Sequence, residues 1–182
     1  MTHHATASRV IDAPADEVFS VITDISRLPD WNRAITGVIE QPQALEVGGE
    51  WVVQMHALGQ SWHSRATVRE LDLTRRRFGY RSATDDGNPS YAHWTWAVAD
   101  HPGGAHVTVN VELHPRTFWR RVLLVWIRHR QLARIELPAS LTSLEAFTSR
   151  GAAPIPPAPA SEPLTTKSPG TVPGANHGGV HQ

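Results

Sequence analysis

The sequence contains no cysteine, which excludes disulfide bonds, thiolate metal sites and cysteine nucleophiles. No apolar run approaches the length that spans a membrane, and the N-terminal residues MTHHATASRV lack the apolar stretch of a signal peptide. Neither sign of charge is in excess, because 17 basic residues balance 17 acidic ones. We therefore expect a soluble, cytoplasmic protein.

Motifs for catalysis, phosphate binding and metal binding are also missing. The glycine pairs at 48–49 and 103–104 are typical of turns rather than of phosphate-binding loops, and no nucleophile elbow indicates a Ser/His/Asp triad. The eleven histidines mostly lie near the chain ends or at outward positions of predicted strands, without the spacing and carboxylate partner of a metal site. We expect neither a metal nor another cofactor.

Proline, glycine, serine and threonine dominate the sequence from Gly151 onward, GAAPIPPAPASEPLTTKSPGTVPGANHGGVHQ. A segment of this composition cannot bury enough apolar surface to offset the entropy lost on ordering. We therefore expect one folded domain over residues 1–149 and a disordered tail, rich in proline and glycine, over residues 150–182.

The first part of the chain, VIDAPADEVFSVITDISRLPDWN (10–32), predicts a strand followed by a helix. A strand over residues 8–13 leads into a helix that begins near Pro14, because proline suits the first helical turn. The pair Leu28-Pro29 predicts the end of the helix, since a residue before proline avoids helical angles. Trp31 is then expected on a short loop.

The pattern that follows has a period of two. Apolar and polar residues alternate along six successive segments joined by turn signals, namely 35–41, 48–57, 60–71, 77–82, 91–98 and 107–113. This pattern predicts an antiparallel sheet with one apolar face and one solvated face.

Residues 116–147 return to helical spacing and carry an excess of arginine. Pro138 should kink this helix or split it near residues 134–138. The six consecutive apolar residues 122–127 exceed what a surface helix needs, which favours burial on two sides, by the sheet and by a partner or ligand. The expected apolar stripe comprises Phe118, Val122, Val125, Leu132, Ile135, Leu141, Leu144 and Phe147.

The arginines of this segment suit a solvated helix face better than an anionic partner. Weak contact with an anionic membrane surface and oligomerisation through the helix remain open. We expect no nucleic acid partner, because the predicted sheet lacks an exposed basic and aromatic platform.

This order of elements resembles the Bet v 1/START-like (SRPBCC) superfamily, in particular its polyketide cyclase/dehydrase and lipid-transport branch. The residues that carry the resemblance are IDAPADEVFSVITDISRLPDWN (11–32), VGGEW (47–51) and WTWAVADHPGGAHVTVNVEL (94–113), and it covers about residues 6–147. It implies an α+β helix-grip fold, in which a curved antiparallel sheet of about seven strands surrounds a long C-terminal helix and leaves an internal pocket.

Aromatic residues dominate the positions expected to line this pocket, which suits an apolar or aromatic ligand. The alternative is that the rings fill the core completely, and for Trp31 a place at the pocket mouth and a place in the core are equally consistent with the sequence. The expected lining residues are Trp31, Trp51, Val53, Met55, Trp62, Ser64, Phe78, Tyr80, Trp94, Trp96, Val109 and Trp126.

Three functions are compatible with these residues. The first is non-catalytic binding or transport of a small hydrophobic molecule, such as a lipid, an isoprenoid or a polyketide-like compound. The second is a polyketide cyclase/dehydrase-type enzyme, for which Tyr80 is a weak candidate as proton donor beside Ser64 and Ser82. The third is an interaction module whose late helix docks a partner. The absence of inward carboxylates and histidines from the strands over 48–82 favours binding over catalysis.

Overall fold

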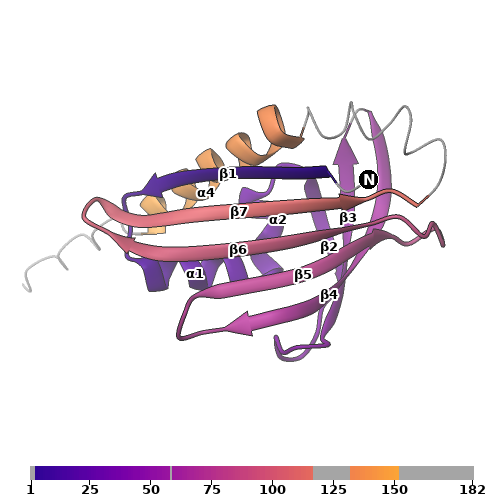
Figure 1. Ribbon diagram of the computed structural model, residues 1–182, viewed down its shortest axis with the longest axis horizontal. Helices are drawn as coiled ribbons and strands as arrows, with labels where there is room; N and C mark the ends of the chain where they lie inside the picture. The colour runs from indigo at the N-terminus through magenta and orange to yellow at the C-terminus, as the bar shows by residue number, and fades with distance from the viewer. Residues whose placement is uncertain (1–2, 58, 117–131, 152–182) are drawn as a thin grey trace, which may run out of the picture.

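The computed structural model describes residues 3–57, 59–116 and 132–151 (Figure 1). Within these ranges, seven strands form one antiparallel sheet in the order β1-β7-β6-β5-β4-β3-β2, so that the first strand lies beside the last. The strands are β1 (His3–Ile11), β2 (Ile35–Glu40), β3 (Glu50–Ala57), β4 (Gln60–Asp72), β5 (Arg77–Thr84), β6 (Tyr91–His101) and β7 (Gly104–His114).

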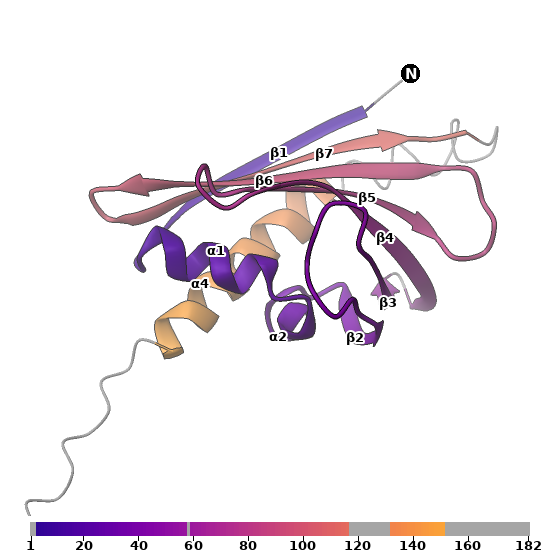
Figure 2. The same cartoon turned by 90° about the horizontal axis from the view of Figure 1, so that it is seen from below.

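The helical elements lie on one side of this sheet and cover its concave face (Figure 2). None of the helices in the described ranges is both long enough and apolar enough to cross a bilayer. They are α1 (Ala15–Thr23), the 3-10 turn η1 (Ile25–Arg27), α2 (Leu28–Trp31), the π-helix η3 (Leu132–Glu136) and α4 (Leu137–Gly151). The expected α+β helix-grip architecture is confirmed. Of the tail expected over 150–182, the residues after Gly151 lie outside the described part of the chain.

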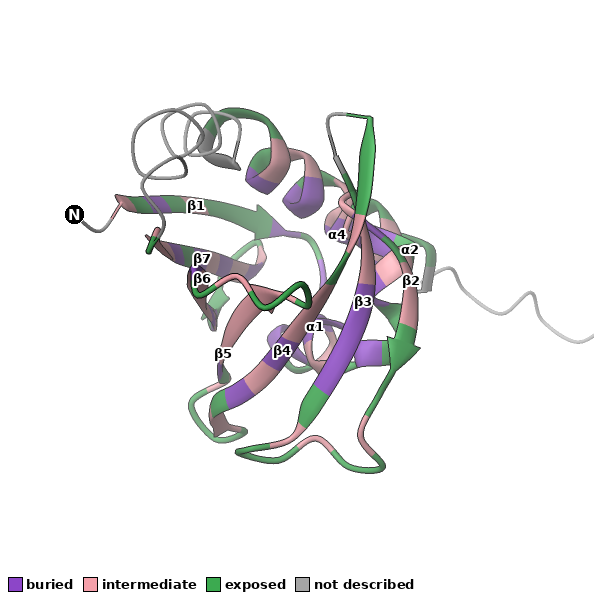
Figure 3. Ribbon diagram, turned by 90° about the vertical axis from the view of Figure 1, so that its right-hand side faces the viewer, coloured by how far each residue is buried: buried purple, intermediate pink, exposed green. Residues whose placement is uncertain are grey.

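The period-two pattern explains why the concave face is apolar. Trp51 is paired with Ala66 across β3 and β4, and Trp96 with Val109 across β6 and β7. All four side chains are buried, and buried positions recur along β3, β4 and α4 (Figure 3). The predicted strands are confirmed with shifted ends: β1 begins earlier and ends at Ile11 rather than at residue 13, and β5, β6 and β7 extend further than the apolar alternation indicates.

The segment before β2 differs from the prediction. Residues Leu28–Trp31 form the short helix α2 rather than a loop, and Leu28 has helical angles (φ −51°, ψ −41°) although proline follows it. Pro29 is tolerated because the first turn of a helix requires no N–H donor. Helix α1 ends earlier, before Asp24, whose carboxylate accepts hydrogen bonds from the backbone N–H (3.1 Å) and hydroxyl (2.6 Å) of Ser26.

The late helix is divided where the proline predicts a division. The π-helix η3 ends at Glu136, and Pro138 lies in the first turn of α4. Leu141 and Leu144 are buried as expected, but the expectation for Ile135 is wrong, because this side chain is 63% exposed. A π-helix has wider turns than an α-helix, so the 3.6-residue period misplaces the side chains within it. Residues 117–131, which include Phe118, Val122, Val125 and Trp126, lie outside the described residues.

Candidate functional site

A cavity of about 60 Å³ lies between the concave face of the sheet and the helices. Strands β3 to β6 supply one wall, and α2, the segment after it, and the junction of η3 with α4 supply the other. The cavity is lined by Leu28, Asn32, Ala34, Ile35, Trp51, Val53, Met55, Ser64, Ala66, Tyr80, Ser82, Trp94, Trp96, Glu136, Leu137 and Ser140.

Aromatic rings form the sheet side of the cavity. The Tyr80 ring lies at the centre, stacked on Trp94 with ring centroids 5.9 Å apart and planes 12° apart, and edge-on to Trp51 at 5.1 Å. These positions are adjacent because the register pairs Tyr80 with Trp94. The wall therefore presents contiguous π surface, which favours offset-stacked or edge-to-face contact with another ring.

Several polar groups of the wall already bond to the protein. The Trp94 indole N–H donates to the Ser82 hydroxyl (2.9 Å), and the Ser64 hydroxyl donates to the Ala83 carbonyl (3.2 Å). Burial raises the pKa of the Tyr80 phenol well above its ordinary value, and a hydrogen bond with Trp96 offsets this only in part. Tyr80 is therefore protonated at neutral pH and is a hydrogen-bond donor rather than a base.

The helical side of the cavity contains a carboxylate that the strand pattern could not indicate. Glu136 is the last residue of η3 and lines the cavity together with Asn32 and Ser140. The lining residues from β3, β4 and β5 are apolar, aromatic or hydroxyl-bearing, and Glu136 reaches the same cavity from the helix. A carboxylate and a neutral phenol thus line one small space.

The structure brings seven of the predicted lining residues together around the cavity: Trp51, Val53, Met55, Ser64, Tyr80, Trp94 and Trp96. Four others lie outside its lining. Trp31 is a core residue, 2% exposed and edge-on to Trp96 at 5.6 Å, and Phe78 packs behind Tyr80 at 5.4 Å. Val109 is fully buried in the core, and Trp62 lies near the start of β4, paired with Met55. Trp126 lies outside the described residues.

The lining residues that the sequence did not indicate come mainly from the segment around α2 and from the η3–α4 junction. They are Leu28, Asn32, Ala34, Ile35, Ala66, Glu136, Leu137 and Ser140. Ala66 was detectable from strand parity, because it alternates with Arg65 and Thr67. The others depend on how the helices cross the sheet, which sequence periodicity does not fix.

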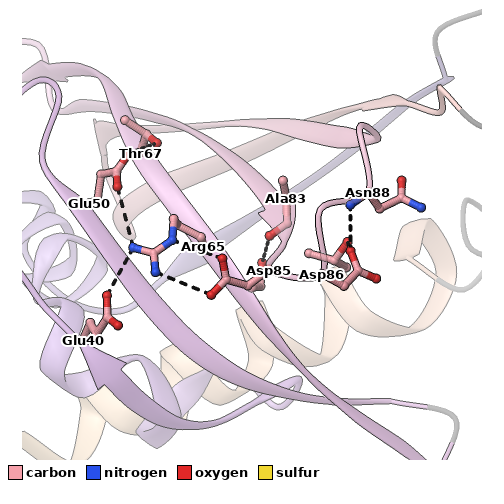
Figure 4. Close-up of polar contacts among 10 residues, drawn as sticks. Glu40, Glu50, Arg65, Thr67, Ala83, Asp85, Asp86 and Asn88 are labelled. Carbon is pink, nitrogen blue, oxygen red and sulfur yellow. Dashed lines mark hydrogen bonds and ion pairs between the residues drawn. The ribbon is translucent and has the colours of Figure 1, made fainter.

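Two polar clusters lie on the outer face of the sheet. Arg65 on β4 forms ion pairs with Glu40 (3.2 Å), Glu50 (3.7 Å) and Asp85 (3.2 Å), and so links β2, β3 and the end of β5 (Figure 4). The hydrogen bond from Arg65 to Asp85 raises the pKa of the guanidinium. Because its charge is matched by partners on adjacent elements, Arg65 is best explained as a link between strands.

The second cluster joins β6 and β7. The Tyr91 ring stacks on His114 at 4.6 Å and accepts the Arg81 guanidinium over its face at 4.3 Å, and His93 lies edge-on to both rings. Burial, and then the charge of His114, lower the pKa of His93. In the part of the chain that the structure describes, no group of three or more His, Asp or Glu side chains is arranged to hold a metal ion.

The chain matches a family model described as polyketide cyclase / dehydrase and lipid transport, over residues 2–146. No curated protein matches it.

Solved structures with the same fold come from bacteria and plants. A Thermus thermophilus protein matches with a TM-score of 0.66 and 16% identity, over 83% of this chain and 100% of that one. The ZhuI aromatase/cyclase of a Streptomyces species matches with a TM-score of 0.63 and 17% identity, over 82% and 95%. Ginseng major latex-like protein 151 from Panax ginseng matches with a TM-score of 0.62 and 13% identity, over 81% and 98%. At these identities the likeness establishes the fold.

Proposed function

The chain belongs to the polyketide cyclase / dehydrase and lipid transport family, and from this premise we propose that it binds a small hydrophobic molecule in the cavity between the sheet and α4. The observation that supports this most is the wall formed by Trp51, Tyr80 and Trp94, whose rings contact one another and also border the cavity. Ligand sites are typically apolar with a few placed polar groups, and this lining fits that description.

The size of the cavity limits how binding takes place. Its volume of about 60 Å³ is far below the roughly 300–1,000 Å³ of a site that encloses a drug-sized molecule. A ligand of that size therefore requires α2 or the η3–α4 junction to move away from the sheet. Ring-containing, polyketide-like molecules suit the aromatic wall better than an acyl chain does, because stacking adds about 0.5–1.5 kcal/mol per ring pair beyond the area buried.

Binding is tested with a neutral fluorescent naphthylamine probe and with native mass spectrometry of the purified protein. Trp94→Leu removes one ring of the wall and should weaken probe affinity by about tenfold, which corresponds to the loss of ~1.4 kcal/mol of contact. Trp62→Leu is the matched control, because Trp62 is outside the lining. Equal probe affinity in the two variants, together with no apolar molecule co-purifying with the wild type, would reject the proposal.

A second candidate function, catalysis of the cyclase/dehydrase kind, is favoured by Glu136 and Tyr80 lining the same cavity. The carboxylate would accept a proton from the substrate, and the neutral phenol would donate a hydrogen bond to oxygen that gains negative charge. For any substrate found, Glu136→Gln should then lower kcat by roughly 10²–10⁴-fold while the affinity for the probe stays the same. Turnover that survives both Glu136→Gln and Tyr80→Phe would show that neither group is catalytic.

A further inference from the structure

A second hollow, of about 230 Å³, is lined by α2, by Arg33 in the segment that follows α2, and by the C-terminal half of α4. Its polar lining includes Arg33, Arg150, Ser143 and Asp30, and Trp31 forms part of its apolar wall. We refer to this hollow as the arginine cleft. Its lining shares no residue with that of the aromatic cavity.

The two guanidinium groups of the arginine cleft are held in place but are not neutralised. The Nε–H of Arg33 donates to the Ser143 hydroxyl oxygen (3.2 Å), and the Nε–H of Arg150 donates to the Ala146 carbonyl (3.0 Å). Neither arginine has a carboxylate within 4 Å among the residues that the structure describes. Each bond uses Nε alone, so the terminal N–H groups of both forks are left to bind an acceptor.

The carboxylate in the cleft does not cancel this charge. Asp30 is engaged by Arg27, whose Nε lies 3.6 Å from the Asp30 Oδ2. Arg27 also lies over the Phe147 ring at 4.3 Å, which keeps a third guanidinium beside the cleft. The net charge around the hollow is therefore positive.

Trp31 forms the apolar wall of the arginine cleft. Its side chain is 2% exposed, yet its indole Nε1 has no hydrogen-bond partner among the described residues. A buried N–H group without an acceptor is unusual and costly. Of the two hollows, Trp31 lines only the arginine cleft, but its Nε1 atom is closed to solvent, so the ring contributes an apolar wall and not a hydrogen-bond donor.

From these observations we propose that the arginine cleft binds a phosphate group beside the Trp31 ring, held by the guanidinium forks of Arg33 and Arg150 and by the hydroxyl of Ser143. All three groups donate hydrogen bonds, and planar guanidinium forks match the oxygen geometry of phosphate. A tetrahedral anion also offers enough oxygens to meet donors that come from both α4 and the segment after α2.

The proposal is tested by titrating the full-length protein with inorganic phosphate at ionic strength held constant with chloride. Arg33→Gln and Arg150→Gln should each weaken phosphate affinity by about tenfold, as expected for the loss of a charge-assisted pair. Arg75→Gln is the control, because Arg75 has a 79% exposed side chain, is paired with Asp72 and lies outside the cleft. In a ¹H–¹⁵N spectrum, the Trp31 indole signal should shift with phosphate and remain unshifted with chloride.

The source of the phosphate is distinguished with vesicles of phosphatidate and phosphatidylcholine. Co-sedimentation of the wild type that is lost in the Arg33→Gln/Arg150→Gln double variant supports the site and identifies a lipid headgroup. Phosphate binding that requires both arginines, with no dependence of co-sedimentation on them, supports the site and identifies a soluble phosphate ester. Phosphate affinity unchanged in both single variants, an equal loss in Arg75→Gln, or a Trp31 signal that does not respond overturns the proposal. The neutral naphthylamine probe should bind the variants as it binds the wild type, which keeps this result separate from the cavity.

Discussion

Filling the aromatic cavity should make the empty protein more stable and at the same time abolish ligand binding. An unfilled cavity costs about 24 cal/mol per Å³, so a volume of 60 Å³ corresponds to about 1.4 kcal/mol. Ala66 lies at the sheet wall of the cavity and is 3% exposed. Ala66→Val adds two methyl groups there on a β-branched side chain that suits a strand. We expect the free energy of unfolding in urea to rise by up to about 1.4 kcal/mol, and Tm to rise by about 3–5 °C.

The control applies the same substitution where no cavity borders the residue. Ala105 on β7 is fully buried and outside the cavity lining, so Ala105→Val should overpack the core and lower the free energy of unfolding by about 1–3 kcal/mol. Opposite signs for the two variants, with the naphthylamine probe excluded only by Ala66→Val, are the expected result. If Ala66→Val is destabilised as much as Ala105→Val and still binds the probe, the space beside Ala66 is not the ligand site and the reasoning is refuted.

Two further predictions concern the sheet. Gly104 has a positive φ of 114°, and a Cβ there would collide with the backbone of Ile11 and Ala13. Gly104→Ala should therefore lower the free energy of unfolding by at least about 3 kcal/mol. The control Gly37→Ala adds a Cβ that meets nothing within 4 Å, and it should be neutral or slightly stabilising in the same urea titration. Burial lowers the pKa of His93 from its ordinary 6.5, so on acidification the unfolded chain binds a proton at this residue before the folded protein does. The contribution of His93 to stability should be complete above about pH 6.5 and should be lost below it. This loss at acid pH should be smaller in His93→Gln, and a pH profile of stability identical to that of the wild type would contradict the role of His93.

The sheet was predictable because alternation reports directly on which face each residue occupies. Alternation predicts one shared face for Trp51, Val53 and Met55, and the register places all three opposite residues of the same face on β4. The same parity places Tyr80 next to Trp94, so much of the aromatic wall follows from sequence alone. Parity does not distinguish a residue that borders a cavity from one that packs beneath it, so it also predicts Phe78 and Val109 as lining residues.

The helices were less predictable, because their contribution depends on angles that local sequence does not determine. The pair Leu28-Pro29 predicts the end of a helix, but a proline near the start of a helix is equally compatible with a new turn. That turn buries Trp31 between the core and the arginine cleft, instead of leaving it on a loop. Arg33 and Arg150 are 117 residues apart in the numbering, and only the packing of α2 against α4 brings them to one hollow.

Glu136 shows why the candidate catalytic group in particular escaped sequence analysis. A stripe drawn at 3.6 residues per turn assigns Ile135 to the buried face and ignores its neighbour, yet Ile135 is 63% exposed and Glu136 lines the cavity. The π-helix η3 accommodates an extra residue per turn immediately before Pro138, and this rotates the face that meets the sheet by about one residue. An amphipathic pattern predicts the most favourable burial of apolar groups, so it cannot predict a carboxylate placed against an aromatic wall. Local conflicts of this kind concentrate at functional sites, which makes Glu136 the residue whose substitution best separates a carrier from an enzyme.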